Sequence, residues 1–140
     1  MVTRQDIIIK AETFLDIPFV HQGRNRNGID CAGLIELTAD ELGILPDNYI
    51  SVRDYAREPD ETMRLYLDKN LKRKSINQRL PGSILFFGYT KNRRGQHLAI
   101  LTKNNLFVHG YSKQKCVCIG RLDDRWRKRL VGVYDYKGIV

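Results

Sequence analysis

One cysteine of this chain stands at the start of a helical pattern, where a thiol can serve as a nucleophile. Cys31 follows a glycine-rich turn over residues 23–28, and apolar residues at helical spacing follow it from Leu34 to Leu42. Asp30 is a favourable N-cap residue, which places Cys31 in the first helical turn. The unpaired backbone N–H groups and the helix dipole favour a thiolate there. The alternative interpretation is a small, inert core cysteine.

Two of the three histidines stand on strands that are expected to pair with each other. His97 opens the apolar run over residues 97–102, and His109 closes the run over 106–109 after a polar turn. An antiparallel hairpin brings these two positions close, and their even spacing is compatible with one face of the sheet. A helix-start cysteine, a strand histidine and an orienting group on the next strand match the arrangement of cysteine peptidases. The alternative is a pair of hydrogen-bonded structural histidines.

Five short stretches stand in a fixed order along the chain, over residues 17–20, 28–35, 80–87, 96–100 and 107–111. They read Ile-Pro-Phe-Val, Gly-Ile-Asp-Cys-Ala-Gly-Leu-Ile, Leu-Pro-Gly-Ser-Ile-Leu-Phe-Phe, Gln-His-Leu-Ala-Ile and Phe-Val-His-Gly-Tyr. Together they resemble the motifs of the NlpC-type, papain-like cell-wall cysteine peptidases. Residues 21–24 and the ending over 122–127 are most similar to the branch found with phage tail genes and prophages.

The residues and the resemblance together predict amide hydrolysis through a thioester, without a cofactor or a metal ion. We expect His97 either to take the proton of Cys31 or to hold it as an ion pair, and His109 to orient the His97 ring. The backbone N–H of Cys31 is expected to contribute to an oxyanion hole. The resemblance implies a peptidoglycan stem peptide as substrate, cleaved between D-Glu and the diamino acid, and phage tail proteins as partners. An acyltransferase or amidase with the same triad, and a catalytically silent wall-binding tail protein, are the alternatives.

Four residues are candidates for substrate binding, and two of them depart from the family pattern. Ala32 stands where the family commonly has serine, and Phe19 where it commonly has tyrosine. In members that trim stem peptides, tyrosine, aspartate and serine hold the free amine of the substrate, so Asp30 alone is retained here. Helix capping is the alternative role of Asp30. His21 is the fourth candidate because it lies near the expected wall of the cleft, and a polar loop position is its alternative.

Length and composition favour one domain over residues 1–140, with 42% apolar residues to fill a modest core. No apolar run approaches the roughly 20 residues of a membrane span, and the first residues lack a signal-peptide pattern. We therefore expect a protein that is associated with a virion or tail, or is cytoplasmic until release, and that acts on the cell wall. Three cysteines argue against a disulfide framework. We expect Cys116 and Cys118 to be buried structural residues, with a metal-binding pair as the weak alternative.

A net charge of +8 indicates an anionic partner. Basic residues gather over 69–79 and again over 125–129. The carboxylates and anionic polymers of peptidoglycan match this charge, and a solvated basic surface is the second interpretation. No nucleic-acid-binding motif accompanies the charge, so nucleic acid is not an expected partner.

Hydrophobic periodicity predicts helices first and short strands afterwards. An irregular crossing over 46–59 and a polar loop over 89–96 are expected between elements. The pattern indicates an α+β fold. The resemblance makes this expectation more specific. It implies a papain-like NlpC-type fold, with N-terminal helices packed on a five- to six-stranded antiparallel sheet. The expected helices run from Thr3 to before Pro18, over 31–42 with a stop at Gly43, and over 60–71, and the expected strands cover 84–89, 97–102, 106–110, 116–119 and 131–136.

Overall fold

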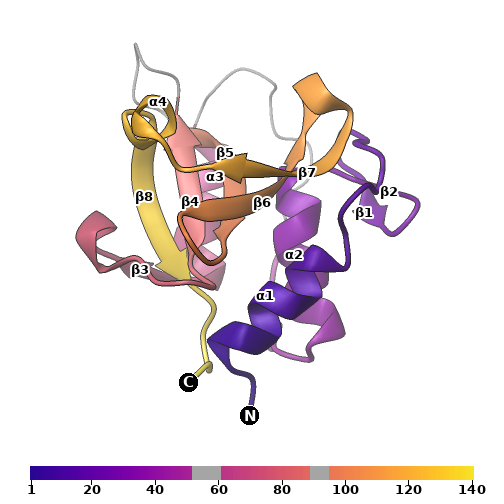
Figure 1. The fold of residues 1–140 in the computed structure, drawn as a ribbon. Coiled ribbons are helices and arrows are strands. Elements are labelled where there is room, and N and C mark those ends of the chain that lie inside the picture. Colours follow the sequence, from indigo (N-terminus) through magenta and orange to yellow (C-terminus); the bar gives the residue numbers. More distant parts are fainter. Residues whose placement is uncertain (52–60, 89–94) are drawn as a thin grey trace.

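Three helices cover one face of a six-stranded antiparallel sheet (Figure 1). The computed structural model describes residues 1–51, 61–88 and 95–140, so most of the expected crossing over 46–59 and of the loop over 89–96 lies outside the described residues. The predicted α+β order is confirmed, and the described strand bounds agree with the prediction to within two residues. The elements are α1 (Arg4–Glu12), β1 (Arg24–Asn25), β2 (Gly28–Ile29), α2 (Cys31–Glu41), α3 (Thr62–Asn70), β3 (Lys72–Lys74), β4 (Ile84–Gly88), β5 (Gly95–Leu101), β6 (Leu106–Tyr111), β7 (Cys116–Arg121), α4 (Asp124–Arg127) and β8 (Leu130–Asp135).

The first two helices begin and end largely where their capping residues predict. Thr3 and Asp6 form a reciprocal capping box at α1, with backbone-to-side-chain distances of 2.9 and 3.1 Å. The helix stops earlier than expected, at Glu12, because the Thr13 hydroxyl donates to the Lys10 carbonyl and the chain then turns. After α2, Gly43 adopts a φ of +71°, and this left-handed residue ends the helix as predicted.

The strand order is β3-β8-β4-β5-β6-β7, and the pairing is antiparallel throughout. Side chains alternate between the two faces of a strand. Leu98 of β5 therefore faces α2, in one core cluster, while Ala99 packs in a second cluster on the opposite face. The edge strand β3 was not predicted, because its Lys-Arg-Lys sequence lacks an apolar alternation. It is held by pairing with β8 and by an ion pair of 3.1 Å between Lys74 and Asp135.

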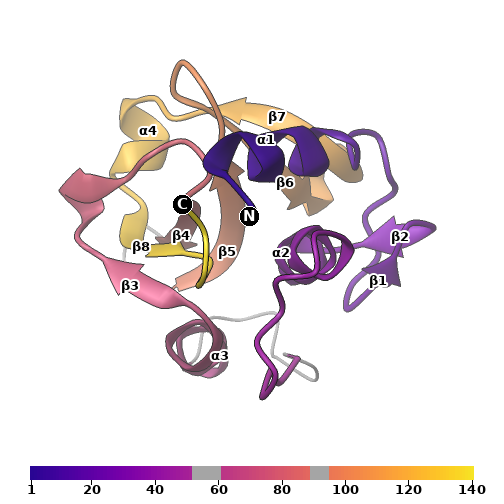
Figure 2. The same cartoon turned by 90° about the horizontal axis from the view of Figure 1, so that it is seen from below.

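The helices and the sheet share one core on the helix-covered face. Helix α2 packs on β5 and β6, α1 packs on α2 and β5, and α3 packs on β3 and β5. Seen from below, the three helices surround the end of the molecule where both termini lie (Figure 2). The Val140 amide donates to the Val2 carbonyl over 3.1 Å, which joins the two ends. Among the described residues, none of the helices has the length and apolar character that crossing a membrane requires.

Candidate active site

Cys31 lies at the first position of α2, next to strand β5. The Asp30 carboxylate accepts from the Gly33 amide over 2.8 Å, so the predicted N-cap is confirmed. The thiol is 6% exposed, and its sulfur lies 3.9 Å from the Gln96 carbonyl oxygen on β5. Strands β5 and β6 pair at only two positions, Ile100 with Val108 and Leu101 with Phe107. The start of α2 lies close to both strands, since the Cys31 sulfur is near Gln96 of β5 and Gly110 of β6 lies next to the backbone of Asp30 and Cys31.

His97 and His109 lie together, as their predicted strands require. His97 Nε2 and His109 Nδ1 are 2.7 Å apart, which is a short hydrogen bond between neighbouring strands. This bond leaves His97 Nδ1 as the ring nitrogen that can accept a proton from a thiol. Within the part of the chain that the structure describes, no hydrogen bond yet joins the Cys31 sulfur to the His97 ring. The structure brings the histidines together and places the thiol against the backbone beside His97.

The two histidines project from the face of the sheet opposite α2. His97 is paired with Phe87 across β4 and β5, and the rings of these two residues stack with centroids 6.2 Å apart. His109 likewise packs edge-on against Phe107, at 4.8 Å. A continuous sheet would separate these rings from a side chain on the helix side. The pairing of β5 with β6 ends at Ile100 and Val108, before it reaches His97 and His109.

Burial dominates the electrostatics of all three side chains. Burial, followed by the nearby Asp30 carboxylate, raises the pKa of the Cys31 thiol to about 12. The lowering expected from the helix start is therefore outweighed. Burial and the positive charge of Arg129 lower the pKa of His109 to about 4, and burial with the His109 and Arg129 charges lowers the pKa of His97 well below 6.5. Each of these shifts favours the uncharged form of its group, and therefore favours proton transfer during attack over a preformed ion pair.

The pKa of His109 predicts how folding stability responds to acid. Between pH 6.5 and about 4 the unfolded chain binds a proton at this histidine and the folded chain does not. The free energy of unfolding should therefore be greatest above pH 6.5 and fall as the pH drops to 4, by roughly 3 kcal/mol for one fully coupled group. Urea unfolding at a series of pH values measures the slope. His109→Asn should reduce it, and an identical slope in this variant would contradict the assignment.

Comparison with known proteins identifies the family. Residues 16–135 match the model of the NlpC/P60 family. The chain belongs to the NlpC/P60 family. Over 112 residues it is 27% identical to the probable endopeptidase NlpC of Escherichia coli (strain K12), a match that covers 79% of this chain and 64% of that relative. The chain thus spans less than two thirds of the curated relative.

Solved NlpC/P60 structures share this fold. An NlpC/P60 family protein from Bacillus cereus ATCC 10987 superimposes with a TM-score of 0.72 at 19% identity, covering 96% of this chain and 40% of that one. The NlpC/p60 domain of the peptidoglycan hydrolase SagA gives 0.68 at 17% identity, covering 96% and 99%. A lipoprotein-like NLP/P60 family protein from Staphylococcus aureus subsp. aureus Mu50 gives 0.67 at 25% identity, covering 95% and 41%. The expected papain-like NlpC-type fold is therefore confirmed.

The Asp30 side chain of this NlpC/P60 chain is bound by hydrogen bonds within the protein. Its carboxylate is fully buried and accepts from the amides of Gln22 and Gly33 and from the Arg24 guanidinium, each over 2.8 Å. Arg24 also approaches Glu36 of α2 at 3.5 Å. These contacts join the turn before β1 to the start of α2 and favour the capping role of Asp30 over a substrate role. Sequence reasoning gave Arg24 no such role, although its place in the turn before an N-cap aspartate was a usable signal.

The other three substrate-binding candidates differ in exposure. Ala32 is 1% exposed and packs in the core cluster on the helix side. Phe19 is half-buried, and its backbone bonds to the Lys115 carbonyl and bridges to Ile29. His21 is half-buried in the turn that follows. Of these positions, Phe19 and His21 keep partly accessible side chains.

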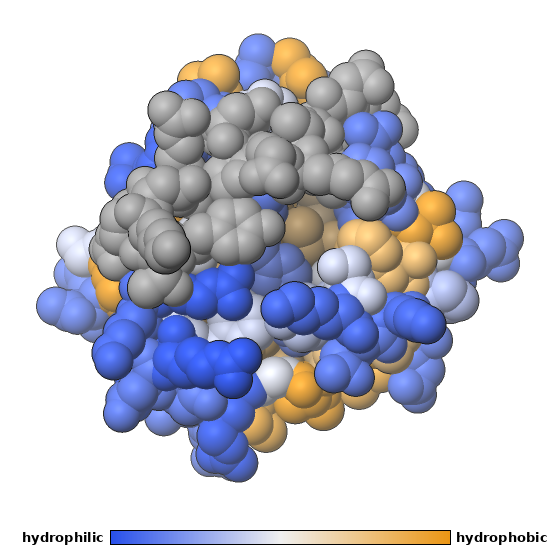
Figure 3. Space-filling view, turned by 90° about the horizontal axis from the view of Figure 1, so that it is seen from above, coloured by the Kyte–Doolittle hydropathy of each residue, from blue (hydrophilic) through white to orange (hydrophobic). Residues whose placement is uncertain are grey.

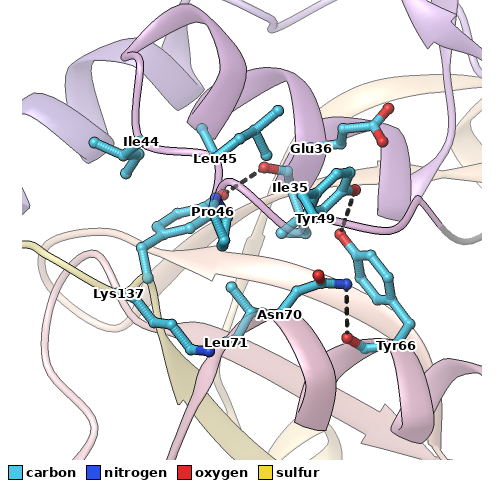
Figure 4. A pocket seen from close by; sticks show the side chains of 12 residues that line it. Ile35, Glu36, Ile44, Leu45, Pro46, Tyr49, Tyr66, Asn70, Leu71 and Lys137 are labelled. Atoms are coloured by element: carbon cyan, nitrogen blue, oxygen red, sulfur yellow. Dashed lines mark hydrogen bonds between the residues drawn. The ribbon is translucent and has the colours of Figure 1, made fainter.

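A separate pocket lies beyond the first turn of α2 (Figure 4). It is partly open to solvent and is bounded by α2, the segment after α2, α3 and the residues after β8. Glu36, Tyr49 and Tyr66 form one polar side, where the two tyrosine hydroxyls lie 3.1 Å apart. None of the three candidate catalytic residues lines this pocket. The pocket is therefore distinct from the position of the Cys31 thiol.

Cys116 and Cys118 stand on β7 next to the histidine pair. Register places Cys118 opposite His109 and Cys116 opposite Tyr111. Both are free thiols, and they are half-buried rather than buried as predicted, because β7 is an edge strand. In residues 1–51, 61–88 and 95–140, no three His, Cys, Asp or Glu side chains gather as a metal site requires.

Gly110 sets the distance between β6 and the start of α2. A Cβ atom there would lie 3.0 Å from the carbonyl carbon and oxygen of Asp30 and 3.2 Å from the Cys31 nitrogen. Because these neighbours are backbone atoms, Gly110→Ala should push α2 away from the sheet and lower stability by about 1–3 kcal/mol as well as activity. Gly132→Ala is the matched control, since its Cβ would meet its nearest neighbours at an ordinary 3.4 Å. Equal losses of activity and unfolding free energy in the two variants would contradict this role.

Proposed function

We propose that this NlpC/P60 chain is a cysteine endopeptidase that hydrolyses an amide bond in peptidoglycan stem peptides, between D-Glu and the diamino acid. The observation that carries the proposal is the His97–His109 hydrogen bond, together with a thiol at the start of α2 whose sulfur lies 3.9 Å from the carbonyl of Gln96, the residue before His97. A nucleophile, a base and an orienting group then stand in the order that cysteine peptidases need. The family match and the relative named as a probable endopeptidase support the same reaction.

The tautomers follow from the hydrogen bond between the histidines. For His97 Nδ1 to accept a proton, its Nε2 must carry one and donate it to His109 Nδ1, which fixes both rings. The Cys31 sulfur attacks the substrate carbonyl carbon while its proton moves to His97 Nδ1. The backbone N–H of Cys31, which has no partner within the helix, stabilises the oxyanion. His97 returns the proton to the leaving amine, and water, deprotonated by His97, then hydrolyses the thioester.

The charge of the chain supports an anionic substrate. The net charge of +8 complements the carboxylates of stem peptides and the anionic polymers of cell walls. Hydrophilic side chains make up much of the coloured surface on the face seen from above, with apolar ones between them (Figure 3). We place the enzyme in a phage tail or prophage setting, with tail proteins as partners. The similarity of residues 21–24 and 122–127 to that branch supports this placement.

Digestion of purified sacculi tests the function. Mass spectrometry of the released fragments should find new amino termini on the diamino acid with the wild-type protein and none with Cys31→Ser. Products cut at the lactyl amide would assign an amidase, and products joined to an added amine would assign an acyltransferase. Wall binding without any released fragment would assign a silent wall-binding protein. Each of these three results contradicts the endopeptidase.

The replaced recognition residues predict weak selection for a free amino terminus. Alanine and phenylalanine at positions 32 and 19 lack polar groups for an amine, and both Asp30 oxygens already have internal partners. We expect kcat/KM for a free stem tripeptide to be comparable with that for a muropeptide that keeps its sugar. A preference above about a hundredfold for the free peptide, or about 2.7 kcal/mol, would contradict this expectation.

A further inference from the structure

Trp126, the single tryptophan of the chain, lies against the histidine pair. The centroid of its indole is 5.6 Å from the His109 ring and 5.9 Å from the His97 ring. It also packs against Phe87 at 4.8 Å and Phe107 at 5.3 Å, the two rings that flank the histidines on the sheet. His109 is buried and His97 is half-buried, and the indole covers part of both rings through these contacts.

The backbone of Trp126 is fixed on both sides within α4. Its amide donates to the Asp123 carboxylate over 3.0 Å, and its carbonyl accepts from the Arg129 amide over 3.0 Å. These bonds hold the indole over the sheet although α4 is only four residues long. Sequence periodicity did not predict this helix. Asp123, a favourable N-cap residue, is the one local feature that could have indicated it.

Arg129 links the indole to the strand that faces His97. Its guanidinium carbon lies 4.4 Å above the Trp126 ring, which is a cation–π contact. Its Nε donates to the Gly88 carbonyl over 2.9 Å, and the Gly88 amide donates back to the Arg129 carbonyl over 2.7 Å. Gly88 directly follows Phe87, the cross-strand partner of His97. The position of the indole is therefore coupled to the position of the imidazole.

We propose that Trp126, held by Arg129, is a positioning residue that shields the His97–His109 pair from water and keeps it hydrogen-bonded and in one orientation for proton transfer. Its role in catalysis rests on the proposed function, but its effect on the histidines does not. A smaller side chain at this position would admit water to the rings. Hydration favours the imidazolium form, which can no longer accept the proton of the Cys31 thiol.

The groups around the pair make Trp126 a suitable test position. Tyr111 of β6 stacks on His109 at 4.6 Å, and Cys118 of β7 lies opposite His109. Arg129 is the charged side chain that lowers the pKa of both histidines, and burial is the larger cause for each. Removing the indole changes burial, and the two hydrogen bonds between Arg129 and Gly88 do not involve the indole.

Histidine titration by NMR tests the proposal in protein labelled with ¹⁵N-histidine. Trp126→Leu should raise the titration midpoints of His97 and His109 by about one pH unit or more, and Trp126→Phe by less. The acid limb of kcat/KM should move with the midpoints. Tyr134→Phe is the control, since it removes a partly buried hydrogen bond of 2.6 Å to Asp68 on the helix side of the sheet. It should lower stability and move neither midpoint nor limb.

Unchanged histidine midpoints in a folded Trp126→Leu protein would show that the indole is only packing and would overturn the proposal. The wild-type protein gives a second measurement if that variant does not fold. Emission from the single tryptophan should fall as the histidines become protonated, and His109→Asn should shift or remove this transition. Emission that stays constant through the histidine titration would also overturn the proposal. Absence of wall hydrolysis with the expected titrations would reject the proposed function alone.

Discussion

Cys31→Ser is expected to abolish the release of wall fragments while the fold and wall binding stay intact. The substitution exchanges one sulfur for one oxygen at a position that is 6% exposed, so packing changes little. A serine hydroxyl is far harder to deprotonate than a thiol. The imidazole that must take its proton is a weak base here, because burial lowers the pKa of His97. We expect kcat to fall by on the order of 10⁴-fold or more.

The matched control for this experiment is Cys118→Ser. Cys118 is also a free thiol, and it stands next to the histidine pair, opposite His109 across β6 and β7. It lies on the edge strand and not at the start of α2, so its replacement should leave turnover within a few fold of wild type. Both proteins should bind sacculi equally and unfold at similar urea concentrations. Fragment release by Cys31→Ser at the wild-type rate would remove cysteine catalysis from consideration.

Local patterns predicted the parts of the fold that depend on neighbours in sequence. Thr3 and Asp30 cap helices as expected, Gly43 ends one, and alternation placed the strands correctly. The two-residue strands β1 and β2 and the charged strand β3 were missed. Strands that short or that polar carry no periodicity, and only their partners in the sheet define them.

In the candidate site, too, local sequence patterns predicted some features, and tertiary packing determines the others. Spacing alone brought His97 and His109 into one predicted hairpin, where their ring nitrogens do meet. The short pairing of β5 with β6 was not predictable, because alternation fixes the face of a side chain and not the length of a ladder. The pKa of Cys31 is raised by the burial that tertiary packing creates. The position at the helix start was therefore not enough to predict the direction of this shift. Trp126 reaches the histidines only through the packing of α4 on the sheet, which no local pattern encodes.

The different roles of the two rings explain why the two histidines should differ in importance. His97 is the side chain that exchanges protons with the thiol and the leaving amine, whereas His109 acts on it through one hydrogen bond of 2.7 Å. An asparagine at position 109 can still accept from His97 Nε2, and so it can hold the same tautomer. An asparagine at position 97 has no basic nitrogen and cannot take the proton at all.

We therefore expect His97→Asn to lower kcat by roughly 10²–10⁴-fold, the usual range for loss of a general base. His109→Asn should lower kcat by about tenfold or less. The loss of kcat in His109→Leu, whose side chain cannot accept the hydrogen bond, should lie between the losses in the other two variants. Single-turnover rates on a defined muropeptide measure the three variants without interference from product release. Circular dichroism and urea unfolding confirm that each variant is folded before rates are compared. If His109→Asn proves as damaging as His97→Asn, the two rings share proton transfer, and the division of roles between base and orienting group is wrong.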